Sequence, residues 1–142
     1  MSLTWIHEPT PLWNADRQRI VGGAPPGVFT LDTLKAGEVV PGEWWRVEDD
    51  GRVVGYGWMD YSWGDAEVLV AVDPDARAHG IGSFIFDRLE DEAGHKGINY
   101  MYNVVPDRHP DPAALKLWLM RRSFVPSHEG GLLKRRVHKR GD

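Results

Sequence analysis

The loop at residues 77–82, RAHGIG, joins an apolar segment to a helix-like pattern and contains one arginine and two glycines. A loop leading from a strand into a helix presents unpaired N–H groups and the positive end of the helix dipole, which suits a phosphate. Gly80 and Gly82 leave the backbone open to a ligand, while Arg77 and His79 can donate to the same oxygens. The pattern predicts an anion site, although a tight turn would need the same glycines for its own geometry.

Two known phosphate loops do not match. A nucleotide P-loop has Gly-Lys-Ser/Thr, whereas Gly82 is followed directly by Ser83, so the lysine is missing. A dinucleotide-binding loop has a third glycine where Ile85 stands, and an acidic residue near the end of the next strand, where residues 102–103 are Tyr and Asn. Both nucleotide sites are therefore excluded.

The elements around the loop are half of a βαβ unit. In residues 66–73, AEVLVAVD, both faces are largely apolar, which is typical of a strand covered on both sides. Residues 80–93 carry an apolar helical stripe opposite several charged side chains. The stripe consists of Ile81, Phe84, Ile85 and Leu89.

The rest of the chain adds strands on either side of this unit. Further strands are expected at residues 43–49, 53–61, 98–105, 123–127 and 131–137, and a second helix at 112–122 with Asp111 as its N-cap. The order ββ-β-α-β-α-β-β predicts an α/β fold with a mixed central β-sheet and flanking helices, with parallel pairing where the first helix crosses over. Residues 1–42 are atypical, and only residues 31–37, LDTLKAG, resemble a helical turn.

Composition limits the class of protein. A chain of 142 residues suits a single domain over 1–142, and 42% hydrophobic with 27% charged residues is typical of a soluble globular protein. No apolar run is long enough to cross a bilayer and no secretory signal precedes the first elements, so we expect a cytoplasmic protein without a membrane partner. The lack of cysteine excludes a thiol nucleophile and transfer through a protein thioester.

Charge and histidine spacing exclude two further classes. Within the basic tail at residues 134–142, the segment 134–140, KRRVHKR, has five Lys or Arg and no acidic residue, leaving 12 basic against 21 acidic residues outside that segment. We interpret the tail as solvated rather than as a nucleic-acid patch, and expect no nucleic-acid partner. The six histidines are scattered, and none has the i, i+4 spacing of a helical metal site, so no metal is expected.

In its setting between strand and helix, the Arg-x-x-Gly-x-Gly loop resembles the acyl-CoA-binding motif of the GNAT superfamily of N-acyltransferases. The family's next helix has the pattern Asn-x-x-Ala-x-x-x-Tyr and ends in Gly-Phe. Here the segment DPAALKLWLMRRSF has Asp111, Ala114 and Trp118 at those places, with residues 123–124 as Ser-Phe and one residue of extra spacing. The resemblance extends from about residue 43 to the C-terminus.

The resemblance implies that acetyl-CoA is the cosubstrate and lies where two central strands, VLVAV and INYMYNV, separate. Backbone groups of Val70 and Val72 would pair with the pantetheine arm, and the Val70 N–H would stabilise the oxyanion of the tetrahedral intermediate. The loop would hold the pyrophosphate, and Asn103 would face the thioester. The implied binding residues are Val70, Val72, Arg77, Ala78, His79, Gly80, Ile81, Gly82, Ser83 and Asn103.

An amine attacking the thioester needs a base, because alkylammonium ions lose their proton only near pH ~10. Glu67 is our candidate, with Asp60 and Asp65 as rivals; a charge at the exposed start of a strand is the alternative reading. The family's proton donor is a tyrosine on the last helix, a position held here by Trp118 or Leu119. Other donors are open: Tyr102, which we select, Tyr100, His109 or water.

The function implied is transfer of an acetyl group from acetyl-CoA to a primary amine by direct attack. The acceptor is a small-molecule or peptide amine, and a homodimer is left open. Four tryptophans in or beside the first hairpin either pack in the core or border the acceptor cleft: Trp44, Trp45, Trp58 and Trp63. The alternative, suggested by the missing tyrosine, is a noncatalytic acyl-CoA-binding module with a regulatory role or a role in protein interaction.

Overall fold

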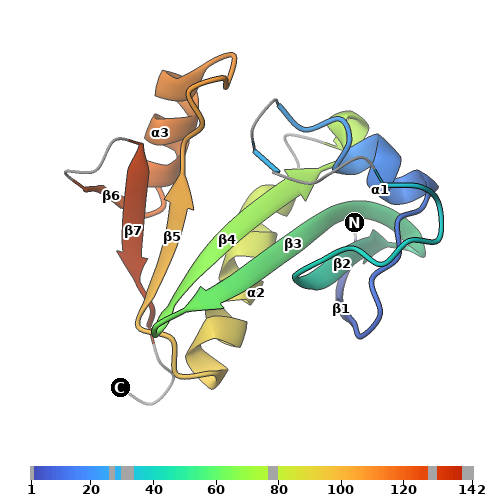
Figure 1. Ribbon diagram of the computed structural model, residues 1–142, viewed down its shortest axis with the longest axis horizontal. Helices are drawn as coiled ribbons and strands as arrows, with labels where there is room; N and C mark the ends of the chain where they lie inside the picture. Colours follow the sequence, from blue (N-terminus) through green and yellow to red (C-terminus); the bar gives the residue numbers. More distant parts are fainter. Residues whose placement is uncertain (1, 26–27, 30–33, 77–79, 128–130, 139–142) are drawn as a thin grey trace.

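A computed structural model describes residues 2–25, 28–29, 34–76, 80–127 and 131–138. Its strands form a seven-stranded sheet in the order β1-β2-β3-β4-β5-β7-β6 (Figure 1). The strands are β1 (Leu3–Glu8), β2 (Glu43–Asp49), β3 (Arg52–Ser62), β4 (Asp65–Val72), β5 (Tyr100–Val104), β6 (Val125–Pro126) and β7 (Leu132–Arg136). The helices are α1 (Ala15–Ile20), α2 (Ile81–His95) and α3 (Pro112–Met120), with a 3-10 turn η1 at Pro74–Ala76. None of the helices in these ranges is long and apolar enough to span a membrane.

The α/β class, the mixed sheet and the order of elements from β2 onward are confirmed. Neighbouring strands pair antiparallel except β4 and β5, which are parallel as expected for strands joined by a crossover helix. This parallel pairing covers only three residue pairs, from Asp65–Tyr100 to Glu67–Tyr102. Beyond them the two strands diverge, and the sheet opens into a V (Figure 1).

Helix α2 lies directly against one face of the sheet because β3 presents glycines to it. A Cβ atom added to Gly55 would lie 2.9 Å from Ile85 Cδ1, and one added to Gly57 would lie 2.8 Å from Trp5 Cη2. Trp5 in turn stacks on Trp45, with ring centroids 5.6 Å apart. The main core fills this face, which is why the apolar stripe of α2 is buried.

The N-terminal segment covers the other face, and here the sequence analysis missed two elements. β1 extends the sheet by pairing with β2, and α1 begins at the N-cap Asn14. A fully buried Arg17 fixes this segment: it donates to the Leu12 carbonyl at 2.8 Å and to the Glu8 carboxylate. Its guanidinium also lies over the rings of Trp44 and Tyr56, at 4.8 and 4.6 Å from their centroids. The turn expected at residues 31–37 lies partly outside the described residues.

Ser123 stands where the family pattern has glycine, and its φ of 68° is in the left-handed region. Its N–H bonds the Met120 carbonyl at 3.1 Å, which closes the end of α3. Because a Cβ atom is strained in this conformation, we expect Ser123→Gly to raise the free energy of unfolding by about 0.5–1 kcal/mol in urea denaturation.

The matched control is Ser62→Gly, which changes an exposed serine in the extended strand β3. There glycine adds only freedom to the unfolded chain, so this variant should lose about 0.5–1 kcal/mol. Equal destabilisation by the two substitutions would contradict a strained Ser123.

Candidate active site

The opening between β4 and β5 begins at a single side chain-to-backbone hydrogen bond. Asn103, buried on β5, donates its Nδ2 proton to the Val68 carbonyl of β4 at 2.7 Å. Because backbone groups alternate along a strand, the polar groups of Val70 and Val72 point to the same edge as those of Val68. The Asp73 N–H, at an odd position, bonds the Val54 carbonyl at 2.8 Å on the β3 side, which agrees with this alternation. The backbone N–H and C=O groups of Val70 and Val72 therefore face the opening, because both valines follow Glu67, the last β4 residue that pairs with β5.

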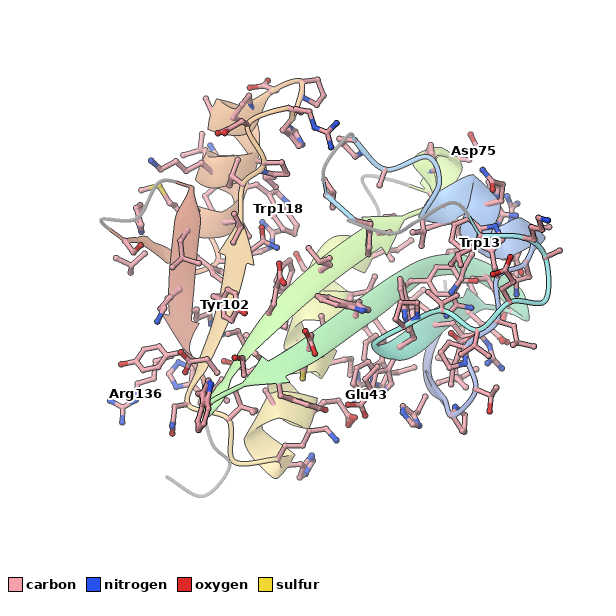
Figure 2. All side chains as sticks on the ribbon, viewed as in Figure 1. Trp13, Glu43, Asp75, Tyr102, Trp118 and Arg136 are labelled. Carbon is pink, nitrogen blue, oxygen red and sulfur yellow. The ribbon has the colours of Figure 1, made fainter. Side chains whose placement is uncertain are left out.

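A cavity of about 430 Å³ fills this opening. Its walls come from β4, β5, the first turn of α2, helix α3 and the N-terminal segment near Val28. Figure 2 shows Tyr102 on β5 and Trp118 toward the wider end of the opening. Most of the lining is apolar, as a pantetheine arm would require, and the valine backbone supplies hydrogen-bonding groups along one side.

The first turn of α2 forms one end of the cavity. Gly80 is its N-cap, has φ 74° and provides no side-chain cap. The N–H groups of Ile81, Gly82 and Ser83 have no intrahelical acceptor, as in any first helical turn, and no acidic side chain lies in this turn. This arrangement fits a phosphate group. Arg77, Ala78 and His79 lie outside the described residues.

Three polar side chains gather at the closed end of the V. Asp60 on β3 is opposite Glu67 on β4, and Glu67 is opposite Tyr102 on β5. Burial, then the nearby Asp60 charge, raises the pKa of Glu67. Burial, then the charges of Glu67, Asp60 and Asp65, raises the pKa of Tyr102. Within the described part of the chain, the carboxylates of Asp60 and Glu67 form neither a hydrogen bond nor an ion pair.

Three of the alternative residues, Asp65, Tyr100 and His109, have other partners. Asp65 pairs with Lys134 at 3.4 Å, and the same ammonium lies 5.8 Å from the ring centroid of Tyr100. His109 lines the cavity, and its Nδ1 accepts the Asp111 N–H at 2.9 Å.

A second cavity of about 560 Å³ adjoins the first on the side of the acidic pair. Asp60, Glu67 and Trp58 line it, and no Lys or Arg does so among the described residues. The two cavities have four lining residues in common: Val28, Leu69, Val104 and Pro106. One compartment suited to a donor thus adjoins one suited to a cationic acceptor.

The family's tyrosine position supplies no hydroxyl group. Leu119 is 1% exposed and belongs to the core, while the Trp118 ring lies over the start of α2. A Cβ atom on Gly82 would lie 3.2 Å from Trp118 Cζ2, so this glycine also makes room for the indole. Arg122 packs on Trp118 with its guanidinium carbon 3.6 Å from the ring centroid. The sequence analysis did not select Arg122. The available signal was that Arg122 follows Trp118 by four residues, a spacing that brings side chains together at the end of a helix.

The comparisons agree with this fold. The model of the acetyltransferase (GNAT) family matches residues 5–122, and the chain belongs to that family. Its members are acyl-CoA-dependent N-acyltransferases, which places this chain in that class of enzyme. Among curated protein sequences, none matches the chain.

Solved structures show the same fold at low sequence identity. N-acetylglutamate synthase from Neisseria gonorrhoeae, complexed with coenzyme A and N-acetyl-glutamate, has a TM-score of 0.71 and 15% identity over 98% of this chain and 36% of its own. An N-acetyltransferase from Staphylococcus aureus Mu50 has a TM-score of 0.52 and 19% identity over 68% of each chain. A phosphinothricin acetyltransferase from Sinorhizobium meliloti, in complex with AcCoA, has a TM-score of 0.53 and 20% identity over 68% of this chain and 61% of its own.

Gly80→Ala tests the anion site at the start of α2. The added Cβ meets no atom of the described residues within 4 Å, and it points into the space where a phosphate would approach the helix. We expect a loss of about 1 kcal/mol in stability from the positive φ, together with CoA affinity about tenfold weaker in calorimetry.

Gly97→Ala is the matched control, because Gly97 has φ 75° and equally open surroundings at the other end of α2. It should lose the same stability and keep wild-type CoA affinity. Unchanged CoA affinity in the Gly80 variant would contradict the site.

Proposed function

We propose that the protein is an N-acetyltransferase that transfers the acetyl group of acetyl-CoA to a primary amine by direct attack. The observation that carries this proposal is the V between β4 and β5. Among the described residues, no strand pairs with the inner edge of β4 beyond Glu67, and the carboxylates of Asp60 and Glu67 at the closed end have no partner. The chain has no cysteine, so transfer does not pass through a protein thioester.

The donor lies with its pantetheine arm along β4 and its thioester near Val70. A carbonyl that accepts the Val70 N–H gains a hydrogen bond that strengthens as negative charge develops on its oxygen. The apolar residues common to both cavities then surround the acetyl group at the junction. This placement puts the electrophilic carbon between the donor cavity and the acidic one.

The acceptor enters from the acidic cavity. Its ammonium group must lose a proton before nitrogen can attack, and Glu67 takes that proton directly or through water. A raised pKa makes Glu67 a better base than an ordinary carboxylate. Two carboxylates without a lining Lys or Arg in the described chain favour a positively charged small-molecule or peptide amine.

Collapse of the tetrahedral intermediate breaks the C–S bond and expels the CoA thiolate, which needs a proton. Tyr102 supplies it, because a phenol is protonated at neutral pH and this one lies opposite Glu67 at the closed end of the V. Glu67 first releases the proton of the ammonium group to solvent. It then takes the second proton of the attacking nitrogen as the amide forms and passes it to the tyrosinate, which restores the tyrosine. The products are the N-acetylated amine, CoA thiol and one released proton.

Glu67→Gln should lower kcat by about 10²–10⁴-fold, as expected for removal of a general base, and leave CoA affinity unchanged. In the wild type, kcat/KM should fall as the pH is lowered through the raised pKa of Glu67, above the usual carboxylate range. Asp65→Asn is the control, since Asp65 pairs with Lys134, and it should keep most of the activity. A pH profile that is the same in the Gln variant and the wild type would rule out Glu67 as base.

The same variant should be more stable than the wild type at neutral pH. A carboxyl whose pKa is raised by folding contributes its stability below its unfolded pKa of about 4.3, and loses it as pH rises through the folded value. Glutamine carries no charge, so it avoids both the cost of burying the Glu67 carboxylate and its repulsion by Asp60. The gain in melting temperature should therefore be present at pH 7 and absent at pH 3. A gain that is independent of pH would show that ionisation of Glu67 is not the cause.

Tyr102→Phe should lower kcat by about 10²-fold while CoA binding stays intact. Tyr100→Phe is the matched control, because Tyr100 lies two residues away on the same side of β5 and packs under Lys134. Equal activity in the two variants, measured as CoA release, would assign the proton donor to another group or to water.

CoA release from acetyl-CoA, followed with a thiol reagent over a panel of amines, tests the activity itself. We expect turnover with cationic amines and little with acidic amino acids. A noncatalytic acyl-CoA-binding module is the second candidate, favoured by the lack of a hydroxyl group at Trp118 and Leu119. Binding of acetyl-CoA without turnover for any amine would support that candidate. A cytoplasmic location and a homodimer stay predictions.

A further inference from the structure

Arg122 is a partly buried cation without a carboxylate partner among the described residues. Its Nη2 donates to Ser83 Oγ at 2.6 Å and its Nη1 to the Trp118 carbonyl at 3.1 Å, both neutral acceptors. Its Nε is buried and has no acceptor. Nearby Arg135 differs, because it pairs with Glu90 at 2.9 Å.

An arginine in this state has lost hydration without gaining an anion. Burial lowers the pKa of Arg122, and the nearest opposing influence, the charge of Asp87, acts without an ion pair. Desolvation of a cation is costly unless an anion or further acceptors replace the water. The structure leaves room for such an anion beside the guanidinium.

The position of Arg122 relates it to the donor cavity. Arg122 lines both that cavity and a groove of about 570 Å³ on the other side of Trp118. Ser83, Phe86 and Trp118 line both spaces as well. Arg122 therefore lies at the boundary between the two spaces, near the first turn of α2.

The length of acyl-CoA explains why a cation is useful at this boundary. With the thioester near Val70 and the pantetheine arm along β4, the first phosphates reach the first turn of α2 and the nucleotide must continue outside the cavity. The groove beyond Trp118 is lined by three arginines, Arg121, Arg122 and Arg135, and by one carboxylate, Asp87. Arg135 pairs with Glu90, and the other two arginines still leave the lining positive, which suits a phosphorylated nucleotide.

We propose that Arg122 binds a phosphate group of acyl-CoA, with the Trp118 ring holding the guanidinium in place, and that the nucleotide end occupies the groove beyond it. This inference rests on the proposed function, because it takes the donor to lie in the V. Trp118, which replaces the family's tyrosine, then has a role in binding, because its indole ring supports the Arg122 guanidinium.

Calorimetry with three ligands tests the proposal: CoA, dephospho-CoA, which lacks the 3′-phosphate, and S-acetylpantetheine, which has no phosphate. Arg122→Gln should weaken CoA binding about tenfold or more and leave the affinity for S-acetylpantetheine unchanged. A loss that persists with dephospho-CoA assigns Arg122 to the pyrophosphate. A loss that disappears with dephospho-CoA assigns it to the 3′-phosphate.

Arg88→Gln is the matched control, since Arg88 is an exposed α2 arginine that lies over the Phe84 ring at 5.0 Å and lines none of the three spaces. It should keep wild-type affinity for CoA. Arg122→Lys, which keeps the charge without the planar fork, should retain part of the binding and serves if the Gln variant is unstable.

Wild-type CoA affinity in the Arg122→Gln variant, or an equal loss with S-acetylpantetheine, would overturn the proposal. Either result leaves the proposed function standing, provided that the wild type binds CoA. Failure of the wild type to bind CoA would instead remove the proposed function.

Discussion

The site depends on one constraint, the short parallel pairing of β4 with β5. The ladder stops after three residue pairs, and just beyond it the Asn103 side chain donates a hydrogen bond to the Val68 carbonyl. Ordinary sheets leave no room for a ligand between neighbouring strands, because each backbone group is already bonded across a spacing of about 4.8 Å. Divergence at this point frees the edge of β4 for a partner that is not protein.

The rest of the fold keeps this opening from closing. On one face α2 is fixed against β3 by the close approach at Gly55 and Gly57, so its first turn cannot move toward β5. On the other face the N-terminal segment is fixed through buried Arg17. The end of β4 is fixed by Asp73, which accepts from Arg19 at 3.3 Å and from the Asp75 N–H at 3.0 Å. Because both faces and the end of β4 are fixed, an interior edge can stay unpaired.

The part of the site that local pattern could predict is the part formed by contiguous residues. The buried strand, the glycine loop and the amphipathic helix follow each other within about 25 residues, and their phosphate chemistry follows from backbone geometry. The alternation of residues along this strand also predicted which face carries Glu67. Its proximity to Asp60 and Tyr102 depends on the register of three strands, which the sequence does not state.

The elements that sequence reasoning missed are held by long-range or polar contacts. α1 has six residues and its central contact is a buried arginine, so it lacks the apolar stripe that indicates a helix. β1 pairs with a strand about forty residues away and is unremarkable in composition. Arg122 was missed because its importance comes from Ser83, a residue of another helix, and from the missing carboxylate rather than from a motif.

Backbone amide NMR during titration with acetyl-CoA tests the central claim, that the free edge of β4 binds the donor. The account predicts that the largest shifts and the strongest new protection from hydrogen exchange occur at the N–H groups of Val70, Val72 and residues 81–83. The N–H groups of Leu69 and Ala71, which point toward β3, should keep the protection from hydrogen exchange that they already have. Saturable binding that leaves Val70 and Val72 unchanged would contradict the account.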